Sequence, residues 1–302
     1  MPCSIGLDLG GTNLRAAAID HSGQLLDHVE GKTAHGTGRE AILRDMVDSI
    51  STLRARLGVS DLAGIGIGVP GFIDMEQGVI RNCNNLPSLE NFPIREELSR
   101  RLGTPIILEN DANAAALGEQ WMGAGRGTAD LVMLTLGTGI GGGIISAGKV
   151  LHGAHGMAGE LGHITVVPNG NPCGCGNRGC VEKHASATAI TAMAKLLGLG
   201  DALTAKDVYD LAVGGNEKAQ TIYVSMGESL GILLATLINA FNFPLYLLAG
   251  GVLGAWDFFA PAMLAETSRR SFTYRATKPR IEKAQLGNEA GLYGAAYLPW
   301  AE

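Results

Sequence analysis

Two segments of the chain repeat one pattern, roughly 125 residues apart. The first is SIGLDLGGTNLRAAAID, from Ser4 to Asp20, and the second is LVMLTLGTGIGGGIISAGKV, from Leu131 to Val150. Each has the composition of a strand, a glycine-rich turn and a second strand, which predicts a β-hairpin. Two unrelated hairpins are the alternative, but each tip carries more glycine than turn geometry requires. The repeat therefore predicts a duplicated α/β architecture with a nucleotide bound between its halves.

Outside the hairpins, the sequence predicts alternating helices and strands. An apolar stripe from Leu43 to Leu57 predicts a helix that ends at Gly58, and Thr37 with Glu40 predicts a capping box at its start. Further strands and helices are expected between Pro, Gly and Asn residues. They are the strands 62–69 and 105–108, the helices 93–102 and 114–121, and a helix that a second capping box opens at Thr204 and Asp207.

The length of 302 residues predicts two domains. We expect a small α/β domain at 1–112, completed by a C-terminal segment of about 288–302, which carries the first hairpin. The larger α/β domain, 113–287, carries the second hairpin and a cysteine-rich loop. Because no linker-like stretch separates them, we expect the two domains to share a hinge near residue 112.

Charge and hydropathy exclude several classes of protein. The net charge of −6 and the lack of a Lys/Arg run argue against a nucleic-acid surface. The first residues, MPCSIGLDLGG, lack the basic and apolar regions of a signal peptide, so we expect a cytoplasmic protein. No residue from Ser229 to Trp256 is charged, but Asn239 and Pro244 interrupt this stretch. It predicts a buried helix over about 228–240 and a buried strand over 245–249, and we expect no membrane span.

The most informative loop reads GELGHITVVPNGNPCGCGNRGCVE, from Gly159 to Glu182. One imidazole and three thiolates on a Gly-rich loop fit a closed, tetrahedral Zn²⁺ site with no position open for catalysis. Disulfides or a redox pair are alternatives, although disulfides fit secreted chains better. Two carboxylates, Glu160 and Glu182, lie among the ligands and indicate a neighbouring site that needs hydrogen-bond acceptors. The predicted zinc ligands are His163, Cys173, Cys175 and Cys180.

The hairpin tips predict phosphate binding. Backbone N–H groups at a glycine-rich turn can approach phosphate oxygens closely, and the Thr12 hydroxyl adds a donor. The carboxylate of Asp8 can hold a hydrated Mg²⁺ that bridges phosphates. In the second hairpin, residues 137–139 would contact the phosphates from the other side. The first tip is not a P-loop, because no Gly-Lys-Ser/Thr sequence follows it. It is not a dinucleotide-binding fingerprint either, because a strand rather than a helix follows it.

Asp111 is the predicted catalytic base. Phosphoryl transfer to a hydroxyl needs a carboxylate that orients the alcohol and takes its proton. Asn110 and Asp111 follow a predicted strand, at the end where ligands bind in open α/β sheets. The alternative is that Asp111 only caps the next helix, a common use of aspartate.

Six motifs together carry a resemblance over essentially the whole chain. They are DLGGTNLRAAAID, GVPG at 68–71, ENDANAA, LGTGIGGGI, GELGHI and CGCGNRGCVE. With them the chain resembles the ROK family (repressors, open reading frames and kinases of sugars). The resemblance implies an α/β, two-domain ATPase fold of the actin, Hsp70 and hexokinase type, with an interdomain cleft. One departure is Asn242-Phe243-Pro244 in place of the usual Asp-Pro, which we expect to adjust a turn only.

The resemblance also implies a role for individual residues. Asp111 would be the base acting on a sugar 6-hydroxyl, and zinc would be held by the four ligands named above. The sugar would be bound by Gly71, Asn85, Asn110, Glu160, His163 and Glu182. ATP and its phosphates would be bound by Asp8, Gly10, Gly11, Thr12, Asn13, Gly137, Thr138, Gly139, Gly250 and Gly251.

The function implied is ATP- and Mg²⁺-dependent phosphorylation of a hexose, with glucose favoured by the motif spacing. N-acetylglucosamine, mannose, allose and fructose are the rival substrates. A repressor or an epimerase–kinase would need a domain ahead of Ser4, and a zinc hydrolase would need an open coordination position. A catalytically inactive sugar sensor is the remaining alternative, although Asp111 and both hairpins are intact. The family also implies a homodimer, and we expect it to act in glycolysis. The charge and hydropathy described above argue against nucleic-acid and membrane partners.

Overall fold

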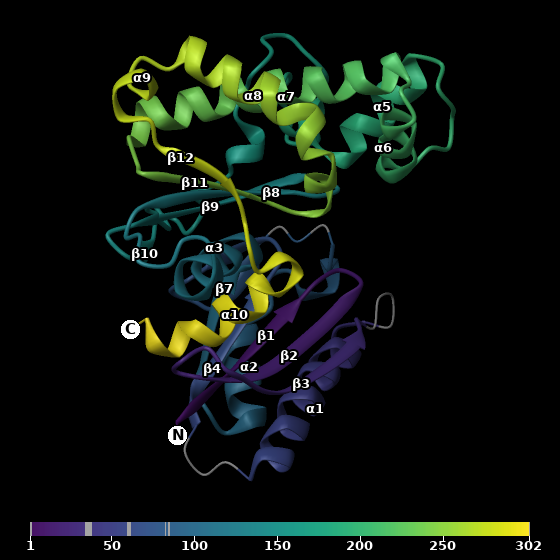
Figure 1. Cartoon of the computed structure of the whole chain (residues 1–302). Coiled ribbons are helices and arrows are strands. Elements are labelled where there is room, and N and C mark those ends of the chain that lie inside the picture. Colours follow the sequence, from purple (N-terminus) through teal and green to yellow (C-terminus); the bar gives the residue numbers. More distant parts are fainter. Residues whose placement is uncertain (1, 34–37, 59–61, 82, 84, 302) are drawn as a thin grey trace. The chain divides into compact units, whose positions relative to one another are not determined.

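The structure is a computed structural model that describes residues 2–33, 38–58, 62–81, 83 and 85–301. Its strands are β1 Cys3–Leu9, β2 Asn13–Asp20, β3 Leu25–Lys32, β4 Leu62–Val69, β5 Phe72–Asp74, β6 Val79–Arg81, β7 Ile106–Asn110, β8 Leu131–Leu136, β9 Ile140–Ser146, β10 Lys149–Val150, β11 Leu245–Ala249 and β12 Arg280–Lys283. Its α-helices are α1 Arg39–Leu57, α2 Ile94–Leu102, α3 Asp111–Met122, α4 Glu182–Ala185, α5 Ala187–Leu196, α6 Ala205–Val213, α7 Glu217–Phe241, α8 Trp256–Arg270, α9 Tyr274–Thr277 and α10 Ala290–Tyr297 (Figure 1).

The two five-stranded sheets have the same strand pattern. Their orders are β3-β2-β1-β4-β7 and β10-β9-β8-β11-β12. In the first sheet, β1 pairs antiparallel with β2 on one side and parallel with β4 on the other, and β7 continues the parallel part. In the second, β8, β11 and β12 are parallel and β10 pairs antiparallel with β9. The duplicated α/β architecture predicted from the hairpins is confirmed.

The chain divides into two compact units. The first runs through Ala129, includes Gly143–Gly159 and resumes at Gln285, and the second comprises Asp130–Gly142 and Glu160–Ala284. Helix α3 belongs to the first unit, where it packs against α10. The two helices approach so closely that a Cβ at Gly294 would overlap the carbonyl oxygen of Ala114. The expected hinge near residue 112 therefore falls inside the first unit, in the first turn of α3.

In the first unit, the central strands carry large side chains on one face and small ones on the other. Ile5 and Leu7 of β1 belong to a buried apolar cluster that α1 and α2 complete. On the other face, a Cβ at Gly6 would lie 2.5 Å from the Leu292 carbonyl oxygen of α10. Gly66 of β4 is equally confined, against the backbone of α10. Gly6 of β1 and the alternating glycines of β4 thus let α10 lie directly on the sheet (Figure 1).

In the second unit, the long helix α7 packs against α8 over one face of the sheet (Figure 1). A Cβ at Gly231 of α7 would lie 2.6 Å from the Met263 carbonyl oxygen of α8, so the two helices touch backbone to backbone. By length and composition, α7 is the one helix among the described residues that could cross a membrane. In the structure, 67% of its most apolar window is buried, which is typical of a core helix.

Several predicted boundaries differ from the structure. Helix α7 begins at Glu217, capped by Asn216, rather than near residue 228, because its first turns are amphipathic rather than wholly apolar. Helix α3 begins at Asp111 rather than 114. Thr37 of the first predicted capping box lies outside the described residues, whereas the box at Thr204 and Asp207 is confirmed. Asn242, in the unusual Asn-Phe-Pro sequence, adopts the left-handed conformation that ends α7.

Candidate active site and metal centre

Most predicted ligand residues of the first unit lie at or just after the carboxyl ends of β1, β4 and β7. The parallel register aligns Asp8 with Gly68, and Gly68 with Glu109. The carboxyl ends of the three strands therefore form one edge, which is where ligands bind in open α/β sheets. The first hairpin tip, Gly71 and Asp111 all come directly after strands that end at this edge.

The tip of the first hairpin is held by Thr33. The backbone N–H of Thr33 donates to the Thr12 carbonyl (2.9 Å), and its hydroxyl donates to the Gly10 carbonyl (2.7 Å). A Cβ at Gly11 would lie 3.4 Å from the Cβ of Asn85. The structure thus brings a predicted phosphate-binding residue and a predicted sugar-binding residue together within this unit.

Asp8 forms an ion pair that the sequence analysis missed. Its Oδ2 lies 2.5 Å from Nη2 of Arg15 on the adjacent strand. The hairpin register places Asp8 directly opposite Arg15, and counting outward from the glycine turn would have found this partner. A hydrated Mg²⁺ at Asp8 would therefore share the carboxylate with a guanidinium group.

Asn110 and Asp111 have different roles at the start of α3. Asn110 is the N-cap, and its side-chain oxygen accepts from the N–H groups of Ala112 (2.9 Å) and Asn113 (3.2 Å). Its amide nitrogen donates to the Gly71 carbonyl (3.2 Å), so two predicted sugar-binding residues are joined. Asp111 is the first helical residue; it is exposed, and its Oδ1 also accepts from Ala112 (2.9 Å).

In the second unit, the second hairpin tip is attached to the start of α5. The Ala187 N–H donates to the Gly137 carbonyl, and the Thr188 hydroxyl donates to the Thr138 carbonyl, both at 2.9 Å. Gly250, predicted to lie near the nucleoside, follows β11, and a Cβ there would overlap the Leu136 carbonyl oxygen. The second phosphate tip and Gly250 are therefore neighbours.

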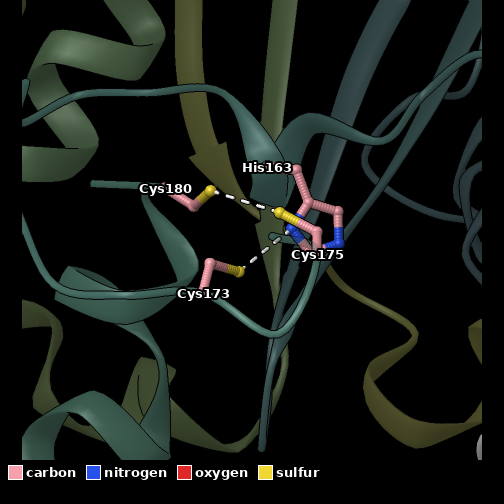
Figure 2. Close-up of side chains that lie close together, drawn as sticks. All are labelled: His163, Cys173, Cys175 and Cys180. Atoms are coloured by element: carbon pink, nitrogen blue, oxygen red, sulfur yellow. Dashed lines mark hydrogen bonds between the residues drawn. The ribbon is translucent and has the colours of Figure 1, made fainter. Parts of the chain in front are cut away.

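The four predicted zinc ligands converge, as Figure 2 shows. Their ligand atoms all lie within 4.8 Å of one another. The sulfurs of Cys175 and Cys180 are 3.7 Å apart, and Cys173 Sγ is 3.5 Å from Nδ1 of His163. Tetrahedral Zn²⁺ with bonds of about 2.3 Å to sulfur and 2.0–2.1 Å to nitrogen needs edges of about 3.8 and 3.6 Å. These residues therefore fit a closed Cys₃His zinc site.

The thiols of this cluster differ in environment. Burial, together with the neighbouring thiols, raises the pKa of Cys180 to about 12. The backbone N–H of Asn177 lowers the pKa of the exposed Cys175. A bound Zn²⁺ deprotonates a coordinating thiol outright, so the high pKa of Cys180 is compatible with ligation.

The two predicted carboxylate acceptors lie beside the cluster. Glu160 Oε2 is 3.8 Å from Nε2 of His163, on the ring edge opposite the cysteines. Partial burial raises the pKa of Glu160; the charge of His163 opposes this shift, and that of Glu182 adds to it. Glu182 accepts from the Ile140 N–H (3.2 Å) and contacts Lys183 (3.1 Å). Glu182 thus joins the cysteine loop to the second hairpin.

A second pair missed by sequence reasoning lies next to Asp111. Glu109 is only 2% exposed, and its Oε2 lies 2.7 Å from Nε2 of His152. The two residues come from β7 and from the loop after β10, 43 positions apart. In the sequence, only the acidic residue that begins ENDANAA, Glu109, pointed to this pair. No local pattern connects it to His152.

The duplicated sheets, each with a glycine-rich hairpin beside parallel strands, define a protein of the actin, Hsp70 and hexokinase-like ATPase fold. The sequence model of the ROK family matches residues 4–301. The chain therefore belongs to the ROK family, as the motifs indicated.

Three similar proteins cover nearly the whole chain. A glucokinase of Halalkalibacterium halodurans is 37% identical over 97% of this chain and 94% of its own. A ROK hexokinase of Thermus thermophilus is 38% identical with a TM-score of 0.89, covering 97% of this chain and 96% of its own. A ROK glucokinase of Streptomyces griseus, solved with glucose and AMPPNP, is 33% identical with a TM-score of 0.79, over 98% of both chains.

Proposed function

We propose that this chain is an ATP-dependent hexose kinase that phosphorylates the 6-hydroxyl of glucose. Full-length similarity to glucokinases supports the proposal, including one solved with glucose and an ATP analogue. The observation that carries it is the position of Asp111. Its exposed carboxylate follows β7 at the sheet edge that also bears the first hairpin tip. A base and a phosphate loop at one edge are the parts that phosphoryl transfer to an alcohol requires.

On the acceptor side, Asp111 would accept the hydrogen of the 6-hydroxyl and take its proton as the oxygen attacks the γ-phosphorus. The remaining hydroxyls need fixed polar partners, because unpaired buried groups are what reject a wrong sugar. The hydrogen bond from Asn110 to Gly71 fixes part of this set. The residues proposed to bind the sugar are Gly71, Asn85, Asn110, Glu160, His163 and Glu182.

On the donor side, backbone N–H groups of both hairpin tips would bind the phosphates, and the hydroxyls of Thr12 and Thr138 would add donors. Asp8 would orient a hydrated Mg²⁺ that neutralises charge on the phosphates. Gly250 and Gly251, which follow β11, would contact the nucleoside. Asn13, at the start of β2, completes the proposed phosphate set.

Zn²⁺, when bound, would supply a structural crosslink and no catalytic step, because protein fills all four positions. The four ligands belong to one loop that also carries Glu160 and Glu182. Holding this loop would keep the two carboxylates and His163 in fixed positions. We propose that the metal organises the loop and that the carboxylates recognise the sugar.

We extend the proposal to the setting of the enzyme. It would act in the cytoplasm at the entry of glucose into glycolysis, as a homodimer without nucleic-acid or membrane partners. The net charge of −6 and the burial of α7 support this part. We also keep the expected division into domains 1–112 with about 288–302, and 113–287, as a proposal to be tested by limited proteolysis.

The test is an assay of ADP formation with ATP, Mg²⁺ and one sugar at a time. Glucose, N-acetylglucosamine, mannose, allose and fructose would be compared at equal concentrations. We expect the highest kcat/KM with glucose. Turnover with none of them would support a sugar-binding protein without activity and overturn the proposal. A clear preference for another hexose would overturn only the choice of glucose.

A further inference from the structure

The carboxylate of Glu109 is buried and fully engaged. Oε2 lies 2.7 Å from His152 Nε2, while Oε1 accepts from the Asn110 N–H (2.9 Å) and from the Asn113 side-chain amide (3.0 Å). Removing a charge from water is costly unless it is both paired and hydrogen-bonded. Glu109 meets both conditions, but only His152 brings an opposite charge.

These contacts surround Asp111. Asn110 precedes the proposed base, and Asn113 lies two residues after it in the first turn of α3. One oxygen of Glu109 therefore holds the chain on both sides of Asp111, and the other is held by His152. The backbone carbonyl of the same histidine accepts from the Ala158 N–H (3.0 Å), which closes the loop over residues 152–158.

We propose that Glu109 and His152 form a positioning pair that fixes Asp111 for proton transfer, and that full turnover requires His152 to be protonated. This proposal rests on the proposed kinase function. Asp111 stays the group that would touch the substrate, and the pair acts through the strand-to-helix turn that carries it. A displacement of about 1 Å at a reacting group can cost roughly 100-fold in rate.

The protonation state of His152 decides how strongly it binds the Glu109 carboxylate. The hydrogen bond that His152 donates to the Glu109 carboxylate raises the pKa of His152, partial burial opposes this, and the Glu109 charge raises it further. Among the described residues, Glu109 is the charged group that acts on His152: Asn113 of α3 is neutral, and His155 of the same loop is exposed. Because the pKa of His152 is raised, His152 is still charged near the ordinary histidine pKa of about 6.5, and the ion pair is lost as pH rises through the raised value.

The experiment combines pH profiles with histidine NMR. Glucose turnover would be followed in stopped assays from about pH 5.5 to 9 for the full chain, His152→Gln and the control His155→Gln. In the wild type, kcat should fall on the alkaline side, with a midpoint equal to the His152 pKa measured by NMR. His152→Gln should lose this limb and about 10- to 100-fold in kcat, with little change in the sugar KM. His155→Gln should behave as the wild type.

A second variant tests the pair without relying on activity. In Glu109→Gln, the NMR pKa of His152 should fall towards about 6.5. An ordinary His152 pKa in the wild type, or an unchanged alkaline limb in an active His152→Gln enzyme, would overturn the positioning role alone. A wild-type chain that phosphorylates no hexose would instead overturn the proposed function, and the positioning role with it.

Discussion

At the scale of single residues, Asn110 and Asp111 show why neighbouring polar residues need not share a task. Asn110 accepts two backbone N–H groups of α3 and is thereby the helix cap. The exposed carboxylate of Asp111 accepts from one of them, Ala112, and belongs to the first helical turn. Because Asn110 already caps the helix, a capping role is not needed to explain an acid at position 111.

The substitution Asp111→Asn tests the role of the base. It keeps the size of the side chain and an oxygen for the Ala112 N–H, but it removes the proposed proton acceptor. We expect kcat to fall by about 10²- to 10⁴-fold, while glucose affinity, measured by calorimetry, stays within about threefold of the wild type. Retained turnover would mean that Asp111 serves only the end of the helix.

Single residues also mark the limit of sequence reasoning. The convergence of His163 and the three cysteines was predictable, because metal geometry demands particular side chains at short spacing, and the structure brings those four side chains together. The pair of Glu109 and His152 was not, since its members are 43 positions apart and meet only through packing. The ion pair of Arg15 with Asp8 was partly predictable, because the hairpin register places the two residues opposite each other once the position of the turn is known.

At the scale of elements, the cysteine loop, α4 and the start of α5 connect the metal ligands to the second hairpin. Glu182 begins α4 two residues after Cys180, the last of the candidate ligands, and accepts from the Ile140 N–H. Thr188, in the first turn of α5, donates to the hairpin tip at Thr138. The loop proposed to bind sugar and the tip proposed to bind phosphate are thus parts of one hydrogen-bonded segment.

Removing one metal ligand tests this segment from the zinc side. Cys175→Ala should release the metal, because the other ligands no longer complete a tetrahedral set. We expect a lower thermal midpoint and weaker glucose binding, measured by calorimetry beside a zinc assay. Cys3→Ala, at a buried thiol outside the cluster, is the control and should keep its zinc. Unchanged sugar affinity in zinc-free Cys175→Ala would separate the metal from sugar recognition.

Thr188→Val tests the segment from the phosphate side. Valine keeps the shape of threonine but cannot donate to the Thr138 carbonyl, so the hairpin tip loses one anchor. A lost hydrogen bond of about 1 kcal/mol predicts a roughly fivefold higher KM for ATP, with the hexose KM unchanged. Thr188→Ser retains the hydroxyl and should resemble the wild type. An equal rise in both KM values would argue against a specific role at the phosphate tip.

Close packing of α10 on the first sheet is a property of elements that stability measurements can test. Gly66→Ala places a methyl group against the Ala295 backbone, which cannot move away without shifting α10. We expect a loss of about 3 kcal/mol or more in the free energy of unfolding by denaturant. Gly31→Ala, where a methyl group meets nothing within 4 Å, is the matched control and should change stability little. Equal stability of the two variants would contradict the packing.

At the scale of the whole molecule, the fold was predictable because one topology is built twice. The glycine turns marked both hairpins, and the structure repeats the same strand order around them. The boundaries of the two units were harder to predict from the sequence, because no linker composition marks them. The chain crosses between the units at Ala129–Asp130, Gly142–Gly143, Gly159–Glu160 and Ala284–Gln285. They follow from packing contacts, such as those of α3 with α10, which only the structure reveals.

The most direct test of the central claim is the chemical identity of the product. The purified chain would be incubated with ATP, Mg²⁺ and glucose, and in parallel with 6-deoxyglucose, and the products identified by phosphorus and carbon NMR. We predict one ADP for each glucose 6-phosphate formed, with no sugar phosphate from 6-deoxyglucose. A phosphate on any other carbon, or no sugar phosphate in either reaction, would contradict a kinase that acts on the 6-hydroxyl.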